Sequence, residues 1–376
     1  MYSPLMDGQT RGHRPLQVAA LSLAAASIMV CIFLCATTWR FSWGLSPGPA
    51  VVLAEAPDLT VWQTLAPPLN FVGRALMVCS CLRSAFKLGL SGFRGLAHDF
   101  DLPNPDSMGA LALICNSFGA LFVVLGAYVP GSLTVGRHTW TLAALVSMSG
   151  CIMLIVFLSI ATIQGHCKEG NPDRSPVSTF APPLSTFATQ NRNGDSFSSE
   201  RMAKAEALRG VMKNLGIIGG LTVVSSTGAV IGKLQVRQDI FGKFLNVLPC
   251  LLAALTLSSG GFRTVAKNFG FPLPALSGFL AVVCNGVGSL LVLLGAIAPG
   301  YARGCIPWSA ALSIPGSLML IAFLGIATIV GELKNMCSAE GDDREGFAQG
   351  VFTSLGIIGG LIFIVALELQ KISTAC

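Results

Sequence analysis

Long apolar stretches separated by short polar segments dominate the chain. They lie near residues 16–38, then near 68–92, 108–129, 140–164 and 208–231, and again near 241–262, 277–298, 307–331 and 347–369. A helix needs about 20 apolar residues to cross the hydrocarbon core of a bilayer. Because the runs are continuous and do not alternate as the strands of a membrane barrel do, the pattern predicts an all-α polytopic membrane protein with nine transmembrane helices.

The pattern of apolar stretches occurs twice along the chain. Residues 72–131 align without a gap onto residues 241–300, with 27 of 60 positions identical, and the string LGIIGGL closes both halves, at 215–221 and 355–361. We call residues 68–232 the first copy and residues 233–376 the second copy. Each copy contains four predicted helices, an even number, so both copies enter the membrane from the same face. The sequence thus predicts two parallel four-helix bundles rather than inverted repeats.

Two further segments lie outside the repeated unit. Residues 1–67 contain a tail, the apolar stretch near 16–38 and a loop; this stretch is longer than an ordinary signal core, which favours a retained anchor over a cleaved signal peptide. Residues 166–204 are rich in Ser, Pro, Asn and charge and have a far shorter counterpart in the second copy. They are predicted to form a mobile inserted loop, a plain linker rather than a regulatory or docking segment.

Composition supports a membrane protein and narrows its partners. Hydrophobic residues make up 52% of the chain and charged residues only 11%, which exceeds what a soluble core can hide. The net charge of +6 is spread over loops and helix ends without a basic and aromatic cluster, so nucleic acid is not an expected partner. The expected partners are anionic lipid headgroups and other integral membrane proteins.

Reactive side chains show no catalytic arrangement in the sequence. The 12 cysteines include no C-x-x-C pair and the 4 histidines have no helical pairing, so no metal is predicted. Neither a nucleophile elbow, nor a phosphate-binding loop, nor an acid pair inside an apolar run is recognisable. An enzyme is therefore less expected than a non-enzyme, and no cofactor is predicted, although a quinone or a bound phospholipid stays possible.

The predicted second helix of each copy contains one asparagine inside its apolar stretch. Asn116 and Asn285 occupy equivalent positions, each with a glycine close by, Gly119 and Gly288. Polar groups inside a membrane are costly and usually have a partner. We expect each amide to bond a neighbouring helix across a close approach; an amide that contacts a ligand is the alternative.

Basic residues lie within the predicted first helix of each copy. Arg74 is matched by Lys243, whereas Arg83 and Lys87 have no charged counterpart in the second copy. The simplest reading of Arg83 and Lys87 is that their long side chains reach the membrane interface. The alternatives are pairing with Asp99 or Asp101 in the following loop, or a site for an anionic lipid, a quinone or a partner carboxylate.

Glycine pairs in the predicted fourth helices indicate close packing. Gly219-Gly220 and Gly359-Gly360 lie inside apolar runs, where glycine lowers helix propensity but lets helix backbones approach. The segments 92–105 and 261–274, which begin with Gly-Phe-Arg, alternate apolar and charged residues. They are expected to lie along the headgroups, with partner docking as the alternative.

These motifs resemble the DoxX family. The resemblance rests on Gly73-Arg74, on Lys87, on Phe100 and Pro103 at the loop exit, and on the closing helices VMKNLGIIGGL and VFTSLGIIGGL. It covers both copies and implies a compact four-helix membrane unit. The closing helices are also similar to those of the surfeit-locus cargo receptors of the endoplasmic reticulum, which carry two such units.

The resemblance implies a role in thiosulfate and quinone electron transfer or in export of secretory cargo. Two departures weaken both roles. DoxX proteins commonly have a glutamate where Asn116 and Asn285 stand, and the cargo receptors end in a lysine-rich tail, whereas this sequence ends in KISTAC.

Three functions remain open at this point. The first is a non-catalytic membrane subunit that packs against other membrane proteins, either as an accessory subunit of a complex such as an electron-transfer assembly or as a cargo adaptor. The second is a quinone-linked redox subunit. The third is a small-solute transporter, which the absence of recognisable buried charge pairs disfavours. The mitochondrial inner membrane and an endomembrane are both compatible with the sequence.

Overall fold

The computed structural model describes residues 59–99, 102–130, 132–135, 138–167, 196–227, 232–268, 273–303, 306–338 and 341–375. The predicted anchor helix near 16–38 lies outside these residues. So do most of the inserted loop and the aspartate at position 101 that was considered as a partner for Lys87.

Helices make up almost all of the described chain. The first copy contains α2 (Leu59–Asp99), α3 (Pro105–Leu125), α4 (Leu142–Cys167) and α6 (Ser196–Ser226). The second contains α7 (Gly232–Asn268), α8 (Pro274–Ile297), α9 (Trp308–Ile326), the π-helical η2 (Ala327–Leu333), α10 (Lys334–Ser338) and α11 (Gly341–Ala375). Seven of the described helices are long and apolar enough to cross a membrane. The chain is an all-α integral membrane protein.

Helix α6 differs from the prediction in two ways. Within the described residues it is not among the seven apolar helices. Its predicted span, 208–231, includes polar Lys213 and Asn214 and ends in residues 228–231, which lie outside the described part of the chain. It also begins at Ser196, inside the segment predicted to be a loop. Residues 200–208, ERMAKAEAL, are nearly all strong helix formers, so this stretch is helical despite its polarity.

The two copies are packed into one body rather than into two separately closed bundles. Consecutive helices lie side by side along the chain, and α11 returns to pack along α2. Within one copy, the first and fourth helices share only a small contact area; α2 packs mainly on α11, α7 packs mainly on α6 and α8, and α6 and α11 meet between them. The short connection between Ser226 and Gly232 explains why α7 packs on α6, because it keeps the two helices adjacent and antiparallel.

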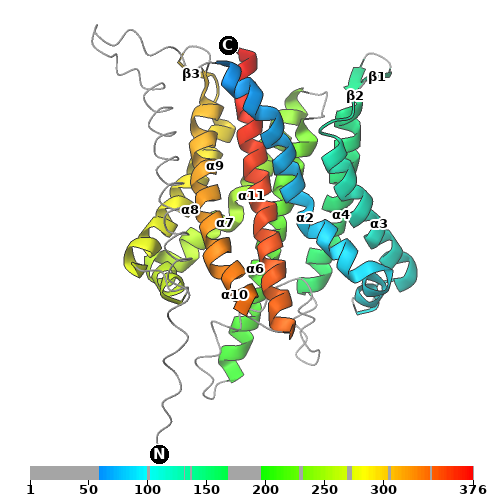
Figure 1. Ribbon diagram of the computed structural model, residues 1–376, viewed down its shortest axis with the longest axis vertical. Coiled ribbons are helices and arrows are strands. Elements are labelled where there is room, and N and C mark those ends of the chain that lie inside the picture. Colours follow the sequence, from blue (N-terminus) through cyan, green and yellow to red (C-terminus); the bar gives the residue numbers. More distant parts are fainter. Residues whose placement is uncertain are drawn as a thin grey trace, which may run out of the picture.

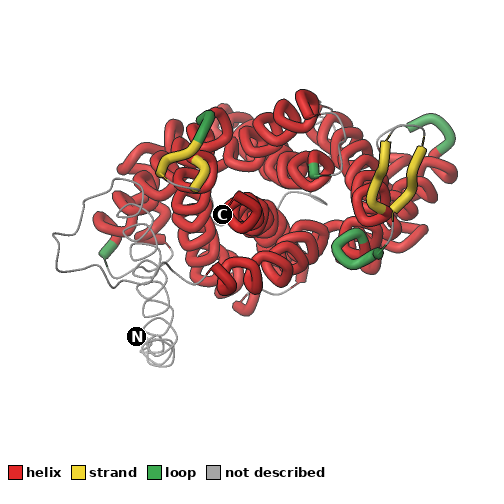
Figure 2. Tube along the Cα trace, turned by 90° about the horizontal axis from the view of Figure 1, so that it is seen from above, coloured by secondary structure: helices red, strands yellow, loops and turns green. Residues whose placement is uncertain are grey.

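Helix α11 is the central element of this arrangement. In the best apolar window of α11, 78% of residues are buried inside the protein, against 28% to 39% for the other spans. Figure 2 shows this helix, next to the label C, surrounded by the others. A helix in this place contacts protein on nearly every side, so its polar residues face other helices rather than lipid.

Glycines form the contacts between the two copies. A Cβ at Gly359 would lie 2.5 Å from the carbonyl oxygen of Gly73, and a Cβ at Gly219 would lie 2.6 Å from that of Gly242. Between the fourth helices, a Cβ at Gly220 would lie 3.1 Å from Cα of Gly360. A side chain at any of these glycines would meet the backbone of the opposite helix, so the helix backbones approach closely here.

Two further glycines named from the sequence lie at seams inside each copy. Gly119 on α3 faces α4 and Gly288 on α8 faces α9, and a Cβ at either position would meet a leucine, Leu154 or Leu320 respectively, within 3.1 Å. The same seam therefore occurs at equivalent places in both halves of the chain.

The repeated Gly-Phe-Arg strings anchor the ends of the first helices. Phe93 and Phe262 are buried and pack edge-on against Phe157 and Phe323, with ring centroids 5.9 and 6.0 Å apart. In α2 this end segment follows a kink at Gly89, whose φ of 56° is a left-handed value that glycine adopts easily. The segments thus continue α2 to Asp99 and α7 to Asn268 and are held partly by protein contacts.

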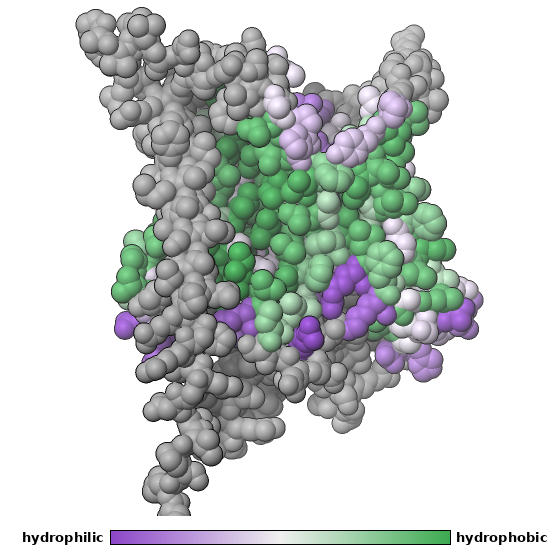
Figure 3. Space-filling model, in the orientation of Figure 1, coloured by the Kyte–Doolittle hydropathy of each residue, from purple (hydrophilic) through white to green (hydrophobic). Residues whose placement is uncertain are grey.

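Two short hairpins lie on the same side of the molecule. One pairs β1 (Ser132–Val135) with β2 (His138–Thr141), and the other pairs β3 (Tyr301–Arg303) with β4 (Ile306–Pro307). Figure 1 places both at the top, where α11 ends. We call this side the hairpin end. On the face drawn in Figure 3, apolar residues form a band across the helices, and the most hydrophilic residues lie below it, toward the opposite end.

Candidate functional site

Four charged side chains are gathered at the hairpin end of the second copy. Lys243 of α7 and Glu368 of α11 are fully buried, and Nζ of Lys243 lies 2.6 Å from Oε1 of Glu368. Asp239 lies one turn before Lys243, with Oδ2 3.1 Å from the same nitrogen. Lys371 completes the group, with Nζ 2.8 Å from Glu368 and 3.6 Å from Asp239. We call these residues the charged cluster. Its two cations balance its two carboxylates, as charges removed from water require.

Sequence reasoning identified only Lys243 in this cluster. No acid pair inside an apolar run was recognised from the sequence, whereas in the structure the fully buried Glu368 and the 17% exposed Asp239 share the same lysines. A signal was present: Asp239 precedes Lys243 by four residues and Glu368 precedes Lys371 by three. Both spacings place opposite charges on one helix face. The sequence does not indicate that α7 and α11 come close together and so join the two pairs.

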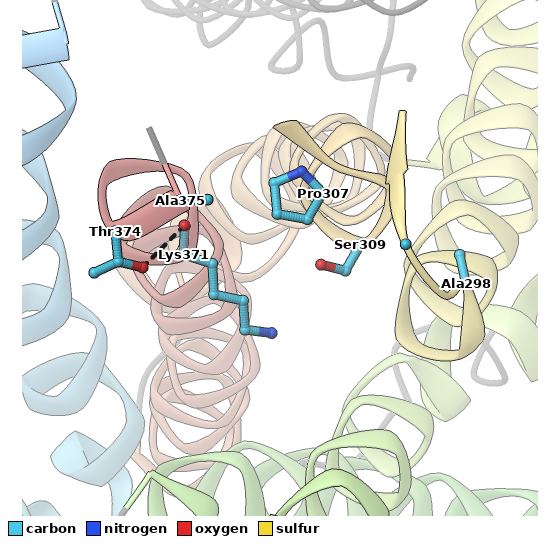
Figure 4. Close-up of a pocket in the computed structure, with 7 residues that line it drawn as sticks. Ala298, Pro307, Ser309, Lys371, Thr374 and Ala375 are labelled. Atoms are coloured by element: carbon cyan, nitrogen blue, oxygen red, sulfur yellow. Dashed lines mark hydrogen bonds between the residues drawn. The ribbon is translucent and has the colours of Figure 1, made fainter. Parts of the chain in front are cut away.

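An open pocket of about 430 Å³ lies beside the charged cluster. It is lined by Ala298, Gly300, Pro307, Ser309, Lys371, Thr374 and Ala375, and Figure 4 shows the Lys371 and Ser309 side chains directed into the space between the helices. The Ser309 hydroxyl donates to Oε2 of Glu368 at 2.8 Å. The pocket therefore opens onto side chains that contact the buried carboxylate directly.

Arg74 occupies the matching position of the first copy but has different partners. Its Nε donates to Oδ1 of Asn70 at 2.7 Å, and its Nη1 donates to the carbonyl of Val123 at 3.1 Å and to the Ser147 hydroxyl. The guanidinium also lies over the ring of Phe363, 5.3 Å from the centroid. These partners come from α2, α3, α4 and α11 and carry no formal charge. Arg74 therefore ties four helices together through neutral acceptors.

Exchanging Asn70 for aspartate is expected to stabilise the protein by about 1 kcal/mol, because a charge-assisted bond is roughly twice as strong as a neutral one. Asn70→Asp copies the Asp239 and Lys243 arrangement of the second copy. Thermal unfolding of the purified protein in detergent measures the effect. The reciprocal change Asp239→Asn should lower the melting temperature; a lower melting temperature for Asn70→Asp would contradict the reading of Arg74.

A second pair of opposite charges lies toward the other end of the molecule. Nζ of Lys213 on α6 is 3.1 Å from Oε1 of Glu332 in the π-helical η2, and the Ser354 hydroxyl of α11 donates to Oε2 of the same carboxylate at 2.9 Å. Both charged side chains are about three-quarters buried. Asn214, beside Lys213, donates to Thr162 of α4 at 3.0 Å. This pair joins helices of the two copies and was not predicted.

Arg83 contacts helix α11. Its Nη1 lies 2.8 Å from Oε1 of Gln349, and its guanidinium lies 5.2 Å from the ring centroid of Phe352. Lys87 is exposed, one turn further along α2. Arg83 thus joins α2 to α11, and the Lys87 side chain is exposed.

Asn116 and Asn285 bond their own helices. Nδ2 of Asn116 donates to the carbonyl of Ala112 at 3.0 Å, and Nδ2 of Asn285 donates to that of Ala281 at 2.8 Å. Oδ1 of Asn116 is buried without a hydrogen-bond partner. The expected bond to a neighbouring helix is therefore not the contact that these amides make. Asn246 does bond between helices, as Asn214 does: its Nδ2 donates to the carbonyl of Gly216 of α6 at 2.9 Å.

Asn116→Leu is expected to change the unfolding free energy by less than about 1 kcal/mol, because the lost bond is local and the buried oxygen has no partner to lose. Asn246→Leu, which removes a bond between helices, should cost more, within the range of roughly 0.6 to 2 kcal/mol seen for such bonds in membranes. Parallel thermal unfolding curves compare the two variants. The opposite ranking would mean that Asn116 has an interhelical role.

No group of three or more His, Cys, Asp or Glu side chains that could hold a metal ion occurs within the described ranges. Comparison of the chain with protein-family models, curated proteins and solved structures gave no match.

Proposed function

We propose that this protein is a non-catalytic integral membrane subunit that packs against other membrane proteins. The proposal rests on the contacts between helices in the interior of the protein. Glycines hold the two copies together, and the buried Lys243 and Arg74 bond side chains or carbonyls of neighbouring helices. Such an interior gives a rigid body, and its outer apolar faces remain for contact with lipid or protein.

Helix α3 offers an ordered outer face for such contact. Its exposed apolar side chains are spaced alternately three and four residues apart, the spacing with which helices pack together. These residues are Leu111, Ile114, Phe118, Leu121 and Leu125. Contact between this face and a helix of another membrane protein is part of the proposal. The partner belongs to a membrane complex such as an electron-transfer assembly, or is a cargo protein.

Native purification in mild detergent tests this function. The expected result is a stoichiometric complex that survives size-exclusion chromatography and whose partners are identified by mass spectrometry. Phe118→Ala should weaken the complex while leaving the isolated protein folded. Its matched control is Val287→Ala, the equivalent exposed position on α8. A protein that always purifies alone, in several mild detergents, would contradict the proposal.

A small-solute transporter is the second candidate, and the buried charges favour it. The sequence kept this function as an alternative, although parallel repeats without broken helices or recognisable buried charge pairs disfavoured it. The charged cluster and the pair of Lys213 with Glu332 lie near opposite ends of the helices, and Glu332 lies in a π-helical segment, a feature often found at functional sites. Charged residues inside membrane helices frequently mark solute or ion pathways.

Flux assays distinguish the two candidates. Purified protein in liposomes, loaded with a pH-sensitive dye, should show no proton or solute flux above protein-free liposomes if it is an accessory subunit. Flux that is lost in Glu332→Gln would favour the transporter. A quinone-linked redox role, as in the DoxX family, requires that the protein bind a quinone analogue, and equilibrium binding tests that alternative. Imaging a tagged full-length protein decides between the mitochondrial inner membrane and an endomembrane.

A further inference from the structure

The pocket at the hairpin end combines a cationic side chain with a wall of small residues. Lys371 is the charged residue of its lining, and 37% of its side chain is exposed. Ala298, Gly300 and Ala375 leave the space open. An ammonium group has three donors, and the hydrogen bond from Lys371 to Glu368 uses one of them. Its remaining donor capacity is therefore available to a ligand in the pocket.

The start of α9 adds further donors to the same pocket. Pro307 precedes the helix and supplies no side-chain cap. The backbone N–H of Trp308 donates to the carbonyl of Gly300, 3.1 Å away, whereas the next N–H groups of a helix have no acceptor inside the helix. Ser309, which lines the pocket, lies in this first turn. Negative charge is favoured at such a position.

The polar residues of the pocket belong to the second copy alone. In the first copy, Ile231 stands where Lys371 is, and Ala143 stands where Ser309 is. Gly228 likewise corresponds to Glu368. The shared fold therefore does not require the pocket's polar groups, and their presence in one copy is evidence of a task specific to that copy.

We propose that this pocket binds a phosphate group, held by the Lys371 ammonium and the first turn of α9. The phosphate belongs either to a phospholipid headgroup or to a free phosphate ester. The position of the pocket suits the first source, because it lies at the end of the membrane-spanning helices, where headgroups are found. The charged cluster keeps Lys371 in place, since Glu368 is itself fixed by Lys243 and Ser309.

A thermal-shift experiment on the full chain, depleted of lipid in a nonionic detergent, tests the proposal. Dioleoyl phosphatidic acid should raise the melting temperature more than dioleoylglycerol, which has the same acyl chains and no phosphate. Lys371→Met is expected to weaken phosphatidate binding by about tenfold or more, since it removes a charge-assisted contact. The matched control is Lys87→Met, an exposed lysine far from the pocket on α2, which should bind as the unmodified protein does.

Inorganic phosphate, compared with chloride at equal ionic strength, separates the two sources. A shift with inorganic phosphate that Lys371→Met abolishes identifies a free phosphate group as sufficient; a shift with phosphatidate alone identifies the lipid. Ala298→Phe, which fills the pocket without changing a charge, should abolish the phosphate-dependent shift even if Lys371→Met folds poorly. Equal stabilisation by phosphatidate and diacylglycerol, or undiminished binding by a folded Lys371→Met or Ala298→Phe protein, would overturn the proposal.

Discussion

Replacing Glu368 with glutamine is expected to lower the free energy of unfolding by about 3 to 5 kcal/mol, the usual cost of removing one partner from a buried ion pair. Glutamine keeps the shape of the side chain but not its charge. Lys243, fully buried and 2.6 Å from that carboxylate, would then share a single acid, Asp239, with Lys371. The charged cluster would carry a net positive charge in apolar surroundings, and this is the source of the loss.

Unfolding midpoints in a detergent titration measure the effect of Glu368→Gln. The control is Asp106→Asn, which also breaks an ion pair, with Arg94 at 3.2 Å, but at a carboxylate that is 77% exposed. Exposed ion pairs contribute about 1 kcal/mol at most, so this variant should unfold almost as the unmodified protein does. The double variant Lys243→Met with Glu368→Met should recover much of the loss. Equal midpoints for Glu368→Gln and Asp106→Asn would contradict the assigned burial of the pair.

Gly219→Leu is expected to prevent the two copies from packing. Even a methyl group at Gly219 would lie 2.3 Å from the backbone nitrogen of Asn246 and 2.6 Å from the carbonyl of Gly242. Backbone atoms cannot rotate away as a flexible side chain can, so α6 and α7 would have to separate. Overpacking of this kind costs about 3 kcal/mol or more, and the bonds across the seam would be lost with it.

The yield of monodisperse protein from mild detergent, together with its melting temperature, measures the assembly of Gly219→Leu. Gly219→Ala should show an intermediate defect. Gly325→Ala is the matched control, since a Cβ there would have no heavy atom within 4 Å and alanine also raises helix propensity. A normal yield of folded Gly219→Leu protein would mean that the glycine seam does not hold the copies together.

Much of the fold was predictable because few backbone structures are compatible with a lipid environment. A long apolar run has few alternatives to a helix, and seven of the predicted spans recur as apolar helices. The glycine positions followed from the same reasoning, because Gly219 and Gly359 have few explanations in an apolar run besides close packing. Helix α6 was harder, since its polar start favoured a loop while its residue types favoured a helix.

The exchange of helices between the copies was not visible in the sequence. Both fourth helices contain the same LGIIGGL string, so either could pack on α2 as far as residue pattern is concerned. The charged cluster was missed for a related reason. Asp239 and Glu368 are distant in sequence, and each taken alone is one acid near one lysine. Only the tertiary arrangement brings α7 and α11 together and turns two local pairs into one buried group.

The pairing of α2 with α11 also bears on how the protein is made. A ribosome releases α2 into the membrane long before α11 exists, and the glycine face that receives Gly359 stays uncovered throughout that interval. Folding therefore cannot be completed one half at a time during translation, as is usual for successive domains. Until synthesis is almost finished, α2 lacks the helix that covers its glycine face in the folded protein.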